Sequence, residues 1–179
     1  MAVDQADAGS GGARGKIQLL RWAIVLAAVL SLGFLPPVRS AVDPPNPIVV
    51  ENQRPGTDSW QLGRAGFRIS NDANGQIKGY ASATSVNRGE SIDFQVSVNP
   101  AQDFTADFYR MGWYGGLGAR HMAHVGPLAG RTQRTCRPDS TTGLVDCAWS
   151  ATFGYSIPDS WTSGIYLVQL TNARKYQAT

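Results

Sequence analysis

The most chemically suggestive segment is the run Tyr109-Arg110-Met111-Gly112-Trp113-Tyr114-Gly115-Gly116. Rings placed among glycines could stack on a sugar or another flat ligand, with a guanidinium beside them. In the interpretation that we favour, the two rings instead cap one end of the fold, and the glycines permit a tight backbone. The run lacks the spacing of a phosphate-binding loop. The candidate binding loop therefore comprises Arg110, Trp113, Tyr114 and Arg120.

His121 and His124 are the only two histidines, and their spacing could let them share a metal ion on a helical turn. No third ligand is near in the sequence, and the glutamate of a metalloprotease motif is missing. Four acidic residues flank expected strands or turns: Asp103, Asp107, Asp139 and Asp146. A glycosidase needs two carboxylates placed across a sugar, which sequence alone cannot establish. The Gly-x-Ser-x-Gly signature of a nucleophilic serine is also missing. We therefore assign no catalytic residue, no metal ligand and no cofactor.

Cys136 and Cys147 are the only cysteines in the chain. Their spacing is far from Cys-x-x-Cys, which disfavours a redox-active pair, and a zinc site would need two further ligands. In an oxidising compartment they would form a structural disulfide. Because the closed loop is short, we expect it to contribute about 2–3 kcal/mol to stability.

Strict alternation of apolar and polar residues over 92–98 predicts a strand with one buried face. Further strands are expected at 48–50, 77–83, 104–111, 148–155 and 165–171, with an irregular stretch over 112–138. Turn residues separate these segments, and no long 3.6-residue pattern interrupts them. The pattern predicts an all-β fold, an antiparallel immunoglobulin-like β-sandwich. We divide the chain into a signal segment (1–40), an extended lead-in (41–63) and the β-sandwich domain (64–179).

The N-terminal segment carries a basic region followed by an apolar run over 22–35, which Pro36-Pro37 ends. This order is typical of a secretory signal, with cleavage expected between Ser40 and Ala41. The alternative is an uncleaved anchor, although a spanning helix needs roughly 20 residues. Both interpretations place the domain outside the cytoplasm, secreted or in the cell envelope. A membrane would be contacted only through this segment.

The formal charge of +3 comes mainly from the same segment. Four of the sixteen basic residues and two of the thirteen acidic residues precede Ala41, so the rest of the chain carries twelve and eleven. A domain near +1 has no electrostatic footprint for nucleic acid. We expect no nucleic-acid partner.

Several stretches, taken in order, resemble the leading domain of exported bacterial proteins similar to the large (beta) subunit of N,N-dimethylformamidase. They are Glu51-Asn52-Gln53-Arg54-Pro55-Gly56-Thr57, Ile77-Lys78-Gly79-Tyr80-Ala81-Ser82, Tyr109–Gly116 with Gly118-Ala119-Arg120, Thr142–Trp149 and Trp161–Tyr166. The resemblance covers roughly residues 46–179, and the block around Trp113 is its most specific part.

The resemblance implies a β-sandwich followed by a larger α/β domain with an amidohydrolase-like site. In the true dimethylformamidase, that site holds iron bound by tyrosines and a glutamate. The resemblance covers only the β-sandwich, so we expect the catalytic domain to be absent from residues 1–179, and the resemblance transfers no catalytic or iron-binding residue to them. It also implies a missing closing strand after a hairpin at 173–176, as in a fragment.

We therefore expect a non-catalytic, exported module that supports an absent catalytic α/β domain or helps it to bind substrate. The alternative is a stand-alone carbohydrate-binding or cell-envelope-binding module that uses Trp113 and Tyr114.

Overall fold

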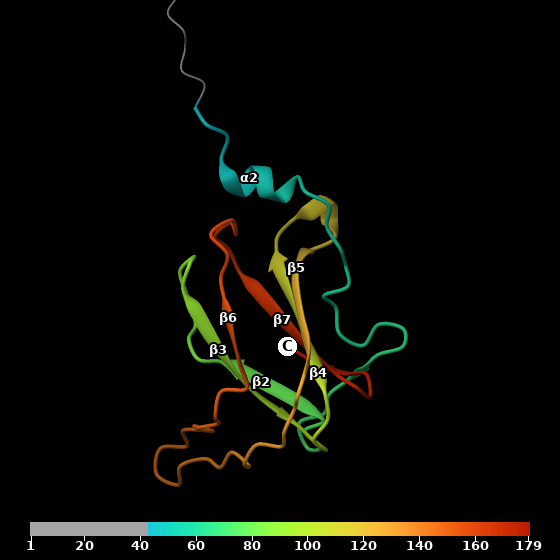
Figure 1. Ribbon diagram of the computed structural model, residues 1–179, viewed down its shortest axis with the longest axis vertical. Helices are drawn as coiled ribbons and strands as arrows, with labels where there is room; N and C mark the ends of the chain where they lie inside the picture. The colour runs from blue at the N-terminus through green and yellow to red at the C-terminus, as the bar shows by residue number, and fades with distance from the viewer. Residues whose placement is uncertain (1–42) are drawn as a thin grey trace, which may run out of the picture. The chain divides into compact units, whose positions relative to one another are not determined.

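The computed structural model describes residues 43–179, and Pro45–Thr179 form one compact unit (Figure 1). Its elements follow the chain as α2 (Pro47–Asn52), β1 (Arg68–Ile69), β2 (Ile77–Ala81), β3 (Ser91–Val98), β4 (Phe104–Met111), the 3₁₀ turn η1 (Tyr114–Gly116), β5 (Ala119–Leu128), β6 (Phe153–Ser156), β7 (Tyr166–Asn172) and β8 (Tyr176–Ala178). The expected signal segment lies outside the described residues. Among residues 43–179, no helix is long and apolar enough to span a membrane.

The strands form two sheets, so the expected β-sandwich is confirmed. One sheet has five strands in the order β1-β8-β7-β4-β5, and the other has three in the order β2-β3-β6. Neighbouring strands run antiparallel except at one edge, where β1 pairs with β8 in parallel. The parallel pair departs from the fully antiparallel arrangement that we expected.

The core lies between the two sheets and is built by alternation. The four apolar residues of β3 that the pattern singled out, Ile92, Phe94, Val96 and Val98, are all buried. They face Phe104, Ala106 and Phe108 of β4, which are also buried. Burial of such side chains stabilises a fold by about 1.5–3 kcal/mol each. The β3 and β4 predictions are confirmed.

The expected strand at 48–50 is wrong, because Pro47–Asn52 form helix α2. Asn46 caps the helix, since its side-chain oxygen accepts a hydrogen bond from the Ile48 N–H at 2.9 Å. Pro47 at the first helical position has its φ set for a helix and lacks only an N–H that no helical carbonyl could accept. These local signals outweigh the β preference of the Ile-Val-Val run. Residues 45–63 of the segment that we expected as an extended lead-in lie within the compact unit.

The expected irregular stretch over 112–138 is also wrong, because it contains η1 and the ten-residue edge strand β5. Two register shifts against β4 hide β5 from a search for alternation. In one of them, Phe108 pairs with Ala123 and Tyr109 with His121, so Met122 is the extra residue of a β-bulge. An extra residue reverses the inward and outward order of all residues that follow.

The strand expected at 148–155 is shorter and later than predicted, since β6 covers Phe153–Ser156. Ala148 has a φ of 40°, which breaks extended structure at that point. Trp149 is instead held by hydrogen bonds to Tyr80 and Arg134.

The hairpin expected at 173–176 is present, and Lys175 takes a left-handed φ of 67° in it. The hairpin leads into β8, which pairs with β7 and β1. Three residues therefore occupy the position where we expected a closing strand to be missing.

Candidate functional site

A buried ion network holds α2 against the loop that follows β4. Glu51 is only 5% exposed, and its carboxylate pairs with the guanidinium groups of Arg120 at 2.5 Å and Arg54 at 3.2 Å. The Tyr114 hydroxyl donates a hydrogen bond to the same carboxylate at 3.1 Å. A buried carboxylate is tolerated because these three groups compensate its lost hydration.

Arg110 extends the network across the end of the five-stranded sheet. Its guanidinium, 2% exposed, donates to the Tyr114 hydroxyl at 2.9 Å. It also donates to the carbonyls of Thr162 at 3.2 Å and Ser163 at 2.7 Å, in the connection between β6 and β7. A rigid planar donor suits this bridging position, where lysine would leave acceptors unfilled. Arg110 therefore links β4 and the loop after it to the distant connection between β6 and β7.

The glycines in and after the Trp-Tyr-Gly-Gly run allow backbone conformations with positive φ. Tyr114 has a φ of 40°, and Gly116 and Gly118 have φ values of 90° and 86°, which side chains with a Cβ rarely adopt. This chain path turns the Tyr114 ring inward while leaving the Trp113 ring outside. The Trp113 N–H donates to the Asn52 Oδ1 at 2.6 Å, which fixes the loop to α2.

The network offers no reactive group. Burial, opposed by the hydrogen bond from Arg110, raises the pKa of Tyr114 above its ordinary value of 10.0. The phenol is therefore neutral at physiological pH and acts only as a hydrogen-bond donor and acceptor. This arrangement agrees with the end-capping interpretation for Tyr114.

The structure leaves only part of the candidate binding loop accessible. Arg110 and Tyr114 are buried, and the Arg120 guanidinium is paired with the Glu51 carboxylate. Trp113 alone is open to solvent, at 71% exposure. Of the two rings that we expected to bind a ligand, only that of Trp113 is accessible, because both faces of the Tyr114 ring are covered.

Further apolar side chains are exposed at the same end of the sandwich. Ile165 is 75% exposed, and its carbonyl accepts a hydrogen bond from the Met111 N–H, two residues before Trp113. Ile48 and Val49 of α2 are about half exposed. We call Ile48, Val49, Trp113 and Ile165 the end surface. Figure 1 shows α2 at the end of the sandwich where η1 and the connection between β6 and β7 lie.

The two histidines both contact the carboxylate of Asp107, a contact that we did not predict from the sequence. His121 Nε2 and His124 Nδ1 both lie 2.8 Å from the Oδ1 atom of Asp107 on β4. The Met122 bulge is the cause, because it places both rings on the outward face of β5 despite their spacing of three. No sequence signal could have found the cluster, because the bulge that brings the two rings to one face leaves no mark in the alternation of a single sequence. No group of three or more metal-binding side chains within residues 43–179 has an arrangement that could hold a metal ion.

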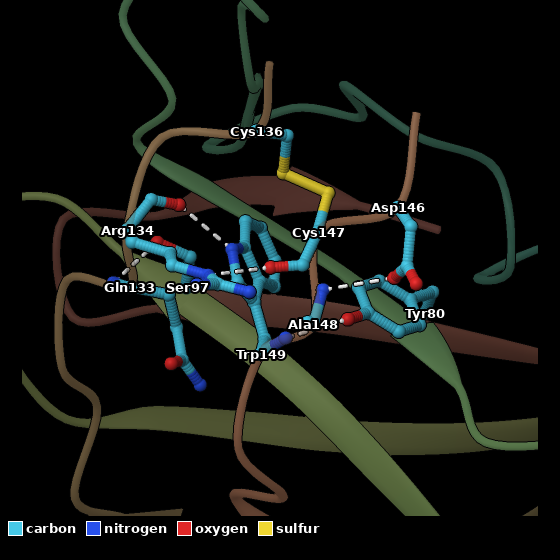
Figure 2. Close-up of a disulfide and its surroundings, with 9 residues drawn as sticks. All are labelled: Tyr80, Ser97, Gln133, Arg134, Cys136, Asp146, Cys147, Ala148 and Trp149. Atoms are coloured by element: carbon cyan, nitrogen blue, oxygen red, sulfur yellow. Dashed lines mark hydrogen bonds between the residues drawn. A yellow bond between two sulfur atoms is a disulfide. The ribbon is translucent and has the colours of Figure 1, made fainter. Parts of the chain in front are cut away.

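The disulfide between Cys136 and Cys147 is present, as expected. Figure 2 shows it above Trp149, whose indole N–H donates to the Arg134 carbonyl at 2.7 Å. The Arg134 guanidinium in turn donates to the Cys147 carbonyl at 2.9 Å. The Trp149 ring also packs on Tyr80 of β2, with centroids 5.4 Å apart. The bridge is therefore a structural clamp on a long loop beside the three-stranded sheet.

The fold and these sites define a β-sandwich module with a buried ion network at one end. Residues 105–179 match the family model described as N,N-dimethylformamidase beta subunit-like, C-terminal. The expected family resemblance is thus confirmed over less than half of the chain, from β4 to β8. No curated protein and no solved structure matches the chain. The leading position of this domain in a longer protein stays a prediction.

Proposed function

We propose that this β-sandwich is a non-catalytic, exported module of a dimethylformamidase beta-subunit-like protein. Its role is to seat a catalytic α/β domain against the end surface. The observation that carries the proposal is the contrast between exposed apolar side chains and the buried network beneath them.

The network gives the end surface a fixed shape. Glu51, Arg110 and Tyr114 join α2, the loop after β4 and the connection between β6 and β7 through hydrogen bonds and ion pairs. Apolar side chains held on such a rigid base lose little conformational entropy when a partner covers them. Exposed Trp and Ile groups of this kind are typical of interaction sites.

A graft tests the seating role. Residues 43–179 would replace the β-sandwich of a family protein that contains the α/β catalytic domain, and amide hydrolysis would be measured. We expect the graft to keep activity and Trp113→Ser/Ile165→Ser to lower it at least about tenfold, since buried anchors carry most interface energy. The matched control is Leu144→Ser/Val145→Ser, which removes two exposed apolar residues of the disulfide loop. Equal losses in both double variants would contradict the proposal.

The non-catalytic role has its own test. The isolated chain is incubated with N,N-dimethylformamide, and release of dimethylamine is followed. We expect none above background, because the histidines contact only Asp107 and Tyr109 among their polar and aromatic neighbours. Turnover that His121→Ala abolishes would instead establish a small hydrolase.

The alternative, a stand-alone carbohydrate-binding module, rests on the exposed Trp113 ring. One open aromatic ring can stack on a sugar face. Binding on a glycan array that Trp113→Ala removes would favour this function over seating. We expect no such binding.

Export is part of the proposal, because the two cysteines are oxidised to a disulfide in the fold and the N-terminal segment has the pattern of a signal. Mass spectrometry of the protein secreted by a bacterial host would test it. We expect an N-terminus at Ala41, whereas an intact Met1 in the cytoplasmic fraction would overturn export.

A further inference from the structure

The two sheets touch along one part of β2 and β7 and separate along the other. Leu170 of β7 packs so closely on Gly79 of β2 that a Cβ at Gly79 would lie 2.9 Å from the Leu170 Cδ1 atom. Further along both strands, a cavity of about 690 Å³ opens beside Ala81 of β2 and Val168 of β7. We call this cavity the inter-sheet groove. It reaches the end surface, because Ile165 also lines it.

The interior of the inter-sheet groove is apolar and aromatic. Phe108 and Trp161 line it and are buried, and the Trp161 ring stacks on that of Tyr166 with centroids 4.7 Å apart. Among the described residues that line the groove, only Arg88 is charged, and its guanidinium donates to the Asp159 carbonyl at 3.3 Å. The groove therefore favours apolar side chains over a charged ligand.

Strand β7 presents an unpaired edge to this groove. β8 pairs with that edge no further than Leu170, so no strand among residues 43–179 lies beside Tyr166 and Val168. On the other edge of β7, the Ile165 carbonyl accepts a hydrogen bond from the Met111 N–H of β4 at 2.9 Å. Because the N–H and C=O groups of successive residues alternate between the two edges, those of Tyr166 and Val168 point to the open one.

An open edge over an apolar groove identifies the kind of occupant. A small apolar ligand would cover the backbone groups of β7 without satisfying them, which is costly. An added extended strand satisfies them and fills the groove with its alternate side chains. The side chains of Tyr166 and Val168 pack against the core as that of Leu170 does, so strand residues directly opposite them would also point inward.

We propose that the inter-sheet groove accepts an extended strand of the catalytic partner, added antiparallel to β7 in the register of β8. Its residues opposite Tyr166 and Val168 are apolar, and the same residues exchange hydrogen bonds with β7. A strand in this direction leads from β8 toward Ile165 and so to the end surface. The choice of the partner as the source of the strand rests on the proposed function, since the end surface is where the partner is seated.

The strand pairing is tested by NMR titration of the purified chain with the peptide acetyl-Lys-Val-Thr-Val-Thr-Val-Lys-amide. Two further peptides carry N-methyl groups, one on its valines and the other on its threonines. Both keep every side chain, but only the methylated valines lose the N–H groups that would face β7. We expect a Kd in about the 100 micromolar range for the parent and threonine-methylated peptides, and binding at least about tenfold weaker for the valine-methylated one. No binding of the parent, or equal affinities of the two methylated peptides, would overturn the proposal.

The same titration locates the peptide. Amide exchange of Tyr166 and Val168 should slow at least about tenfold, whereas the amides of Leu167 and Gln169, which point toward β4, should change little. Val168→Ser should weaken peptide binding about fivefold, because it removes apolar surface from the groove. Leu167→Ser on the opposite face of β7 is the matched control and should leave binding unchanged. Equal effects of the two variants would place the peptide elsewhere and overturn the proposal, and the methylated peptides decide it if Val168→Ser does not fold.

The source of the strand is tested in the graft onto a catalytic domain. We expect the Tyr166 and Val168 amides to exchange at least about tenfold more slowly in the graft than in the isolated chain. Fast exchange of both amides in the graft would overturn the partner as the occupant, even if the peptide binds. Failure of the seating role alone gives a different result: the graft with Trp113→Ser/Ile165→Ser would keep full activity while the two methylated peptides still differed in affinity.

Discussion

At the scale of single residues, Glu51 is the group on which the end of the sandwich depends. A carboxylate buried this deeply must keep its cationic partners, and it binds Arg120, Arg54 and the Tyr114 hydroxyl together. These polar contacts of Glu51 hold α2 in place, although Ile48 and Val49 of the same helix are exposed. It also separates Trp113, which is free for a partner, from Tyr114, which is not.

Removing the charge at Glu51 tests this dependence. Glu51→Gln leaves the guanidinium of Arg120 beside a neutral amide, so we expect the free energy of unfolding to fall by about 1–3 kcal/mol. The measurement is urea denaturation followed by tryptophan fluorescence. Asp72→Asn on an exposed turn is the control, with an expected change below about 0.5 kcal/mol. Similar losses in both variants would contradict a structural role for the network.

The Tyr114 phenol makes a prediction about alkaline pH. Burial raises its pKa above 10.0, so the folded state holds this proton more tightly than the unfolded state does. Its contribution to stability is complete below pH 10 and is lost as the pH rises past 10 toward the raised value. Tyr109 and Tyr166 have pKa values raised by burial as well.

We expect Tyr114→Phe to lose less unfolding free energy than the wild type between about pH 9 and pH 11, although it is less stable at pH 8. Urea midpoints at these three pH values measure the difference. A steeper alkaline loss in Tyr114→Phe would contradict the assignment.

At the scale of elements, the Met122 bulge decides which side chains of β5 meet β4. Without the extra residue, His121 and His124 would point to opposite faces. With it, both converge on Asp107. Bulges are invisible to alternation in a single sequence, which is why β5 and its cluster were not predicted.

The contact of both histidines with Asp107 fixes which tautomer each neutral imidazole adopts. Because a carboxylate accepts, His121 must carry its proton on Nε2 and His124 on Nδ1. Long-range ¹⁵N correlation spectra at about pH 8 would show the Nδ1–H form for His124. Asp107→Ala, which removes the acceptor, should abolish this preference, and Asp103→Ala should not. An Nε2–H form of His124 in the wild type would show that the cluster does not form.

The disulfide loop gives a second prediction for an element. Cys136→Ser/Cys147→Ser should lower the free energy of unfolding by about 2–3 kcal/mol, since the bridge closes a loop with a sequence separation of 11. Thermal melts with and without a reductant measure it. The wild type should lose stability on reduction and the variant should not. A wild-type melting temperature that reduction leaves unchanged would contradict a structural clamp.

At the scale of the whole molecule, the sequence was sufficient to predict the structure of segments in which one physical rule dominated. The alternation over 92–98 and the apolar run of β4 predicted the two central strands, and the cysteine pair predicted its own bond. Prediction failed where local and tertiary effects competed. Asn46 and Pro47 made a helix from a β-prone run, and the ion network turned Tyr114 inward in a way that no short-range pattern encodes.

The central claim is that the end surface seats a catalytic domain, and hydrogen–deuterium exchange tests it most directly. Exchange would be compared between the isolated chain and the same residues grafted onto the catalytic domain of a family protein. We predict that the graft protects amides of 47–52, 113–118 and 162–166 and leaves the loop 139–146 unchanged. Protection of the loop 139–146 alone, or no protection in any of these segments, would contradict the account.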